Sequence, residues 1–207
     1  MRVLVIGATG DLGRAVVDAA LASGHQVSAL ARKPDLADLP GAVRVVQGDV
    51  LDPASLAPAL RGIGSVVCAL GTPSPRQPST LLELGTANVV TAMTQAGVRR
   101  LVCVTLLGVG NSRSNAALLY RHVVLRVLAP MVPDKENQER VVRESGLDWV
   151  LVRPPTIVGF GSRGRARIVP EGKRGRMGLV ARGDLADLLV DAAEKDTYVG
   201  QAIAAGR

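Results

Sequence analysis

The chain begins MRVLVIGATGDLGR (residues 1–14), where an apolar run stops at Gly7 and further glycines follow at positions 10 and 13. A short apolar run that ends at a glycine predicts a buried strand, and the residues behind the third glycine predict a helix. Three glycines between a strand and a helix have two interpretations. They shape the turn, or they leave room for a ligand that touches the backbone.

The same change from strand to helix recurs along the chain. Six runs rich in Val, Leu and Ile lack the alternation of half-exposed strands, which is typical of strands buried on both faces of a parallel sheet. These runs are 3–7, 25–32, 43–49, 65–71, 100–108 and 147–154. Helical patterns stand at 11–24, 52–62, 79–97 and 134–146, and a last helix is expected from about 184 to 194. This alternation predicts an α/β fold with a doubly wound parallel sheet, helices on both faces, in a single domain.

Two segments interrupt the alternation. The stretch NAALLYRHVVLRVLAPM (115–131) is apolar on much of its circumference. We expect a helix there that packs on the sheet, covers a substrate pocket or joins two subunits. Beyond Pro155, glycine and arginine dominate, which predicts a loop or a short hairpin near the functional site.

Size and hydropathy limit the class of protein. A chain of 207 residues is long enough for one α/β core. It contains no uncharged apolar run of about 18 residues that could span a bilayer. The first apolar run leads into glycines rather than into a small-residue cleavage site, so a signal peptide is not expected. We therefore expect a soluble, cytoplasmic protein that does not act in a membrane.

The histidines and cysteines argue against metal chemistry. The sequence has two histidines, His25 and His122, and its two cysteines, Cys68 and Cys103, stand inside apolar runs. Neither cysteine has the spacing of a metal or redox motif. We expect two buried thiols and no metal.

The charge balance indicates an anionic partner. The formal net charge is +7, which attracts phosphorylated cofactors as readily as nucleic acid. The segment SRGRARIVPEGKRGR (162–176) is strongly basic, but aromatic residues make up only 2% of the chain and offer no surface on which bases would stack. We expect this segment to attract an anionic substrate or to be a solvated loop, and we do not expect nucleic-acid binding.

The glycine turn is well placed to hold a dinucleotide. In an α/β unit the helix after the first strand directs its N-terminus, with several unpaired N–H groups, at the carboxyl edge of the sheet. Glycines let a pyrophosphate approach this backbone, and the last glycine lets helix and strand pack closely. The position of GATGDLG (7–13) between an expected strand and an expected helix therefore predicts a bound dinucleotide.

The end of the second strand bears on the choice of cofactor. This position faces the adenosine ribose and carries Asp or Glu where the 2′-OH is bound, whereas this chain has Arg32 followed by Lys33. An arginine would bind a 2′-phosphate through charge-assisted hydrogen bonds worth about 1.5–3 kcal/mol, so we expect NADP(H); the alternative is a solvated Arg-Lys pair. By position, GDV (48–50) would flank the adenine, and ALGT (69–72) would lie near the ribose and pyrophosphate.

Five motifs together resemble a known family. They are GATGDLG (7–13), GDVLD (48–52), LGT (70–72), GTANVVTAMTQAGVRRLVCVT (85–105) and RESGLDWVLVRPP (143–155). In this order they resemble atypical short-chain dehydrogenases/reductases with an NAD(P)H-binding domain, in particular the biliverdin reductase B/flavin reductase group and NmrA-like redox sensors. The resemblance covers nearly the whole chain, as one domain (1–207). It implies a Rossmann-like fold, NADP(H) as cofactor and, as in the reductase members, hydride transfer to flavins or linear tetrapyrroles.

The residues that we expect to contact the cofactor come from these motifs and from the turn. They are Gly7, Thr9, Gly10, Asp11, Leu12, Gly13, Arg32, Lys33, Asp49, Val50, Leu70, Gly71, Thr72, Thr105, Lys135 and Pro154. The substrate is expected near the segments 107–133 and 155–180.

The catalytic residues of the family are only partly present. Ordinary members use a Tyr-x-x-x-Lys pair, in which the lysine holds the nicotinamide ribose and lowers the tyrosine pKa so that a proton can pass. Here the matching stretch MVPDK has Lys135, but Met131 replaces the tyrosine, and a thioether transfers no proton. Lys135 either holds the ribose or is an ordinary surface lysine near a helix start. Tyr120 does not rebuild the pair, because Val124 stands four residues later.

Two polar positions of the flavin reductase group are also replaced. Leu106 follows Thr105 where that group has serine after threonine, and Thr156 follows the proline pair where it has histidine. Thr105 and Thr156 keep hydroxyls, so with Lys135 they are the candidate catalytic residues. The apolar Leu106, Leu107 and Met131 would either form a floor on which a planar acceptor stacks or belong to the core.

Two functions remain open at this stage. The first is an NADPH-dependent oxidoreductase that transfers hydride to a flavin, a quinone or a related planar acceptor, with water as the proton source. The second is a non-catalytic NADP(H)-binding redox sensor or assembly factor, with a protein partner or a second copy of the chain. The replaced polar positions favour the second, and the complete cofactor edge favours the first.

Overall fold

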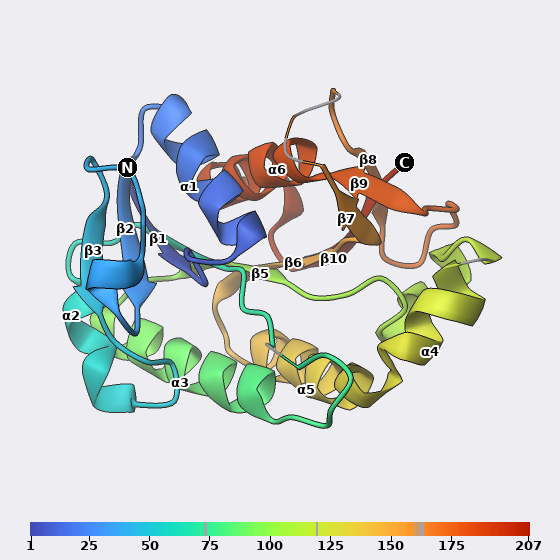
Figure 1. Ribbon diagram of the computed structural model, residues 1–207, viewed down its shortest axis with the longest axis horizontal. Coiled ribbons are helices and arrows are strands. Elements are labelled where there is room, and N and C mark those ends of the chain that lie inside the picture. The colour runs from blue at the N-terminus through green and yellow to red at the C-terminus, as the bar shows by residue number, and fades with distance from the viewer. Residues whose placement is uncertain (73, 119, 160, 162–163) are drawn as a thin grey trace.

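The buried apolar runs become the strands of a central sheet. The computed structural model describes residues 1–72, 74–118, 120–159, 161 and 164–207. Within them the large sheet has the strand order β3-β2-β1-β4-β5-β6-β10-β8 (Figure 1). Its strands are β1 (Arg2–Ile6), β2 (Gln26–Ala31), β3 (Arg44–Gln47), β4 (Ser65–Cys68), β5 (Arg100–Val104), β6 (Asp148–Arg153), β8 (Arg167–Pro170) and β10 (Gln201–Gly206). All neighbours pair in parallel except β8, which runs antiparallel to β10.

Helices cover both faces of this sheet, as expected. Figure 1 shows α1 (Asp11–Ala22) and α6 (Arg182–Glu194) on one face, and α2 (Ala57–Leu60), α3 (Leu81–Ala96) and α5 (Val132–Arg143) on the other. Alternate residues of β1 belong to different cores: Val3 and Val5 pack in the cluster of α1 and α6, and Leu4 and Ile6 in that of α2 and α3. Burial on both faces explains why the strand runs show no polar alternation.

Several element boundaries differ from the expected ones. The expected helix 52–62 is a 3-10 turn at Pro53–Ser55 followed by α2. The Asp52 carboxylate accepts a hydrogen bond from Ala54 N at 3.2 Å, and the two prolines at 53 and 58 leave little continuous helix. The strand expected over 100–108 ends at Val104, and α5 covers Val132–Arg143 rather than 134–146.

The segment after Pro155 is more ordered than the sequence indicates. In place of a loop or hairpin, β7 (Thr156–Val158) pairs in parallel with β9 (Leu179–Ala181) in a second small sheet, and β8 joins the large sheet. The sequence pattern also missed β10, whose alanine-rich stretch QAIAAG lacks the branched residues that favour strands. Part of the basic segment 162–176, at 162–163, lies outside the described residues.

The expected helix over 115–131 is a chain of short turns instead. It contains a π-helical turn at Tyr120–Val124, α4 (Leu125–Val127) and a 3-10 turn at Ala129–Met131. One side of these turns packs into a third buried cluster that includes Leu107 and Met177. Residue 119 within this segment is outside the described part. None of the helices described has both the length and the apolar character that crossing a membrane requires.

A buried carboxylate joins the two helices of one layer. Asp134 of α5 is 2% exposed, and its two oxygens accept hydrogen bonds from Leu82 N at 3.1 Å and Glu83 N at 2.8 Å. These are first-turn N–H groups of α3, which have no partner within the helix. Asp134 therefore caps α3 from the neighbouring helix and fixes the position of both.

Replacing this cap should destabilise the fold. We expect Asp134→Ala to lower the free energy of unfolding by about 2–3 kcal/mol, because two N–H groups lose a charged partner. Urea denaturation followed by circular dichroism measures the change. Glu136→Ala, an exposed substitution in the same helical turn, is the matched control. Equal stability of the two variants would contradict the capping role.

Candidate functional site

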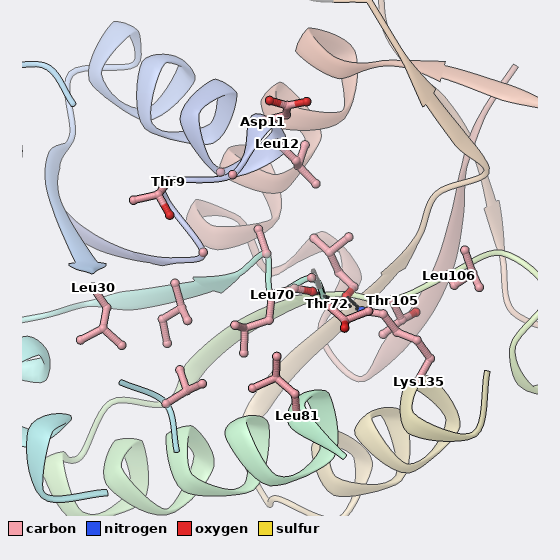
Figure 2. A pocket seen from close by; sticks show the side chains of 18 of the residues that line it. Thr9, Asp11, Leu12, Leu30, Leu70, Thr72, Leu81, Thr105, Leu106 and Lys135 are labelled. Carbon is pink, nitrogen blue, oxygen red and sulfur yellow. Dashed lines mark hydrogen bonds between the residues drawn. The ribbon is translucent and has the colours of Figure 1, made fainter. Parts of the chain in front are cut away.

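A cleft of about 620 Å³ lies at the carboxyl ends of the strands, where the strand order reverses between β1 and β4. Ligands bind at this position in open α/β sheets. Figure 2 shows Thr9, Asp11 and Leu12 on the α1 side, Leu30 toward one end, and Thr105, Leu106 and Lys135 toward the other. The cleft thus runs from the end of β2 to the ends of β5 and β6.

The structure brings most of the residues predicted to contact the cofactor into this one cleft. Its lining includes Gly7, Thr9, Gly10, Asp11, Leu12, Gly13, Arg32, Asp49, Val50, Leu70, Gly71, Thr72, Thr105, Lys135 and Pro154. Among the described residues, the predicted cofactor contact Lys33 and the candidate catalytic residue Thr156 do not line it. Gly48 and Ala69, from the stretches 48–50 and 69–72 expected near the cofactor, also line it. The sequence did not single out the other lining residues, which are apolar: Ile6, Leu30, Leu51, Leu81, Val104, Pro155 and Ile157.

Two of the three glycines are required by the fold itself. Gly7 has φ +82°, and a Cβ on it would lie 2.6 Å from the Ala69 carbonyl oxygen. A Cβ on Gly13 would lie 2.0 Å from the Gly7 carbonyl oxygen, so α1 can start this close to β1 only with glycine there. Packing alone therefore explains glycine at positions 7 and 13, without a ligand.

Gly10 differs from the other two. Its φ is −81°, and a Cβ on it would have its nearest contact at 3.4 Å, an ordinary distance, to the Gly7 carbonyl oxygen. The fold does not demand glycine at this position. Gly10 precedes α1, whose N-terminus has no side-chain cap among the described residues, so the open space beside it adjoins unpaired N–H groups.

An unforeseen arginine braces the turn. Arg14 donates to the Thr9 carbonyl at 3.3 Å and to the Ala37 carbonyl at 3.0 Å, and it also bonds Asp38. It therefore ties the glycine turn to the segment that follows Arg32. Arg32 itself is exposed and lines the β2 end of the cleft.

Lys135 is buried, which excludes the surface-lysine alternative. It is 4% exposed, and its Nζ donates to the Val104 carbonyl at 2.9 Å, to Gln138 Oε1 at 2.9 Å and to the Leu70 carbonyl at 3.4 Å. Burial lowers the pKa of Lys135, although neighbouring thiols and carboxyls act against this shift. The ammonium joins the chain leaving β4 to the end of β5 at the wall of the cleft.

Thr105 connects the cleft to a buried ion pair. Its Oγ1 donates to Glu139 Oε1 at 2.7 Å. The Glu139 carboxylate in turn accepts from Arg153 Nε at 2.8 Å and from Nη2 at 2.6 Å. Sequence reasoning missed both partners; the available signal was that Glu139 stands one helical turn after Lys135 and so shares its face of α5.

The apolar end of the cleft is only partly the one expected. Leu106 and Met131 line it, together with Pro155 and Ile157, whereas Leu107 is fully buried in the core. Thr156 does not line the cleft although its neighbours Pro155 and Ile157 do, because successive side chains of a strand point in opposite directions. The two thiols are buried as expected, and Cys68 and Cys103 are direct neighbours on β4 and β5.

Comparison with known proteins assigns the family. Residues 7–196 match the family described as NAD(P)H-binding, so the chain belongs to that family. This confirms the resemblance carried by the motifs and identifies an NAD(P)H-binding protein.

The relatives differ in what their names state. The chain is 36% identical over 157 residues to (4-alkanoyl-5-oxo-2,5-dihydrofuran-3-yl)methyl phosphate reductase of Streptomyces griseus subsp. griseus, covering 75% of this chain and 48% of the relative. It is 29% identical over 165 residues to photosystem II assembly factor Ycf39 of Synechocystis sp., covering 77% and 45%. The chain thus spans about half the length of these curated relatives.

A solved structure has the same fold. Anaerobillin reductase ChuY of Escherichia coli O157:H7 matches with a TM-score of 0.82 at 23% identity, over 100% of this chain and 97% of that one. At this level of identity the match establishes the shared α/β fold.

The two kinds of glycine should respond differently to substitution. We expect Gly10→Ala to keep the Tm of the free protein while it weakens NADPH binding at least about tenfold, because a methyl group would separate phosphate and backbone. Gly13→Ala should lower the Tm instead, since its Cβ would clash with the Gly7 carbonyl. Thermal unfolding and titration of NADPH fluorescence measure both. Unchanged affinity in Gly10→Ala would show that the phosphates do not approach here.

Proposed function

We propose that this protein is an NADPH-dependent oxidoreductase that transfers hydride to a flavin or a related planar acceptor. The observation that supports this most is one cleft with an open glycine turn in the middle, an arginine at one end and an apolar surface at the other. NADPH would supply the hydride. The chain's own residues would bind it, orient it and shield it from water.

The residues present fit such a cofactor. The volume of about 620 Å³ lies within the range of roughly 300–1,000 Å³ that small-molecule and cofactor pockets have. Gly10 leaves space where a pyrophosphate would meet the first turn of α1. At the other end, Lys135 is held beside Thr105 and the end of β5, where the nicotinamide ribose would lie.

Arg32 is the basis for choosing NADPH over NADH. It lies at the end of β2, lines the cleft and replaces the carboxylate that would bind a ribose 2′-OH. A 2′-phosphate here gains a charge-assisted hydrogen bond, worth roughly ten- to a hundredfold in affinity.

This choice is tested by reversing the charge. We expect Arg32→Asp to weaken NADPH binding at least about tenfold and to leave NADH binding equal or stronger. Lys33→Asp is the matched control, because it changes the charge equally at an adjacent exposed residue that is not part of the cleft lining described. Titration calorimetry with both cofactors measures the effect. Equal affinity of the unmodified protein for NADP and NAD would remove the reason for the choice.

The apolar end suits a planar acceptor. Leu106, Met131, Pro155 and Ile157 line it beyond Lys135, and they come from the two segments, 107–133 and 155–180, or from their immediate neighbours. Flavin reduction consumes NADPH, a proton and the oxidised flavin, and yields NADP and the reduced flavin. Because Met131 transfers no proton, water is the proton source in this proposal.

A binding protein without catalysis is the second candidate. Two observations favour it: Met131 stands where a tyrosine would donate a proton, and one relative of this chain is named as an assembly factor. In this case NADPH would bind and a protein partner, or a second copy of the chain, would recognise the occupied state.

Turnover separates the two candidates. We expect the absorbance of NADPH to fall when the protein is supplied with at least one acceptor from a panel of FMN, lumiflavin, menadione and biliverdin. Heat-denatured protein is the control for direct reaction between the reagents. Tight NADPH binding without oxidation by any acceptor would contradict the reductase proposal and support the second candidate.

A further inference from the structure

One hydroxyl group at the apolar end of the cleft has a fixed hydrogen-bond partner. Thr105 lines the cleft at the end of β5 and is 4% exposed. Its Oγ1 lies 2.7 Å from Glu139 Oε1. An ionised carboxylate only accepts hydrogen bonds, so the single hydroxyl proton of Thr105 is directed away from the cleft.

The Glu139 carboxylate is held in place by a fixed partner. Its side chain is 6% exposed, and that of Arg153 is 2% exposed. Arg153 donates to both carboxylate oxygens, at 2.8 and 2.6 Å. Its remaining nitrogen is held by Asn111 Oδ1 at 3.0 Å and by Glu171 Oε1 at 3.3 Å. A bidentate pair of this kind has one geometry, so the Glu139 carboxylate stays in the position where it accepts the hydrogen bond from Thr105.

The side chains around Thr105 offer no free hydrogen-bond donor among the residues described at this end of the cleft. The three acceptors around Lys135 Nζ, at 2.9, 2.9 and 3.4 Å, match its three protons. The neighbouring lining residues Leu106, Met131 and Pro155 are apolar. With its proton bonded to Glu139, Thr105 Oγ1 has only lone pairs to offer a ligand. A buried ligand carbonyl placed against them would lose its hydrogen bond to water without replacement.

We infer that Glu139 is a positioning residue that makes Thr105 a hydrogen-bond acceptor, so that this end of the cleft selects planar acceptors carrying an imide or lactam N–H. The inference rests on the proposed function. An isoalloxazine carries an imide N–H at N3 and a linear tetrapyrrole carries lactam N–H groups, whereas a quinone presents only carbonyl oxygens. The polarity of Thr105 therefore disfavours quinones, because a polar site rejects a ligand that leaves its group unpaired.

The test compares lumiflavin with N3-methyl-lumiflavin, which lacks the imide proton. Both are titrated by flavin fluorescence into the protein saturated with NADP⁺, so the result does not depend on turnover. We expect the unmodified protein to bind lumiflavin about ten- to a hundredfold more tightly than its methyl derivative. Turnover of lumiflavin with NADPH is measured in parallel.

Two substitutions of Thr105 separate the effect of hydrogen bonding from that of the added bulk of the methyl group on the ligand. Thr105→Val removes the lone pairs at nearly constant volume, and the ratio of the two dissociation constants should fall to within about twofold of one. Thr105→Ser keeps the hydroxyl and should keep the ratio. Neither substitution removes a partner of the Glu139–Arg153 ion pair.

A third variant addresses Glu139 directly. Glu139→Ala frees the Thr105 proton and should lower the ratio, a change that loss of stability alone would not produce. Because it also leaves Arg153 without its partner, its circular dichroism and Tm are measured first. If it does not fold, the Thr105 variants decide the question.

The outcomes keep the two proposals apart. A ratio near one in the unmodified protein, or an equal ratio in Thr105→Val, overturns the inference even if lumiflavin is reduced. Weaker NADP⁺ binding by Thr105→Val with an unchanged ratio also overturns it, because Thr105 would then serve the nicotinamide carboxamide. A high ratio lost in Thr105→Val supports the inference even if NADPH is not oxidised, and in that case only the proposed activity fails. Absence of lumiflavin binding overturns the inference.

Discussion

The close approach of α1 to the end of β1 is the constraint on which the rest of the structure depends. Gly13 faces the carbonyl of Gly7, and a Cβ there would lie 2.0 Å from that oxygen. Glycine at both positions lets the helix begin directly behind the strand, so its unpaired N–H groups reach the edge where the strand order reverses. Arg14 then ties the turn to the segment after β2.

The second determinant of the site is the inward face of α5. Asp134, Lys135, Gln138 and Glu139 are all buried on this helix, although its composition is strongly polar. Asp134 binds the N-terminus of α3, and Lys135 binds the backbone carbonyls at the ends of β4 and β5. Gln138 donates to Thr86, and Glu139 accepts from Thr105 and Arg153. Buried polar groups require such partners, so each of these contacts stabilises the position of the helix in the fold.

Sequence patterns were informative where burial repeats regularly, and less so elsewhere. The strands β1 to β6 and the helices α1, α3 and α6 follow from continuous apolar runs, glycine stops and helical periodicity. The segment 115–131 does not form one helix, because its apolar residues pack on a local cluster with Leu107 and Met177 rather than along a straight axis. The strand β10 was missed since alanine has no strand preference of its own, and only its pairing with β6 and β8 makes it a strand.

The sequence by itself determined the α/β class, the position of the cleft at the glycine turn and most of the residues around it, because these depend on local patterns along single elements. Tertiary structure alone decided that Gly10 is free of packing demands while Gly7 and Gly13 are not, and that Lys135 is buried. It also decided that the Thr105 hydroxyl donates its hydrogen bond to Glu139. These properties depend on distances between atoms far apart in the chain, and hydrogen-bond direction in particular follows from the partner that folding brings within reach.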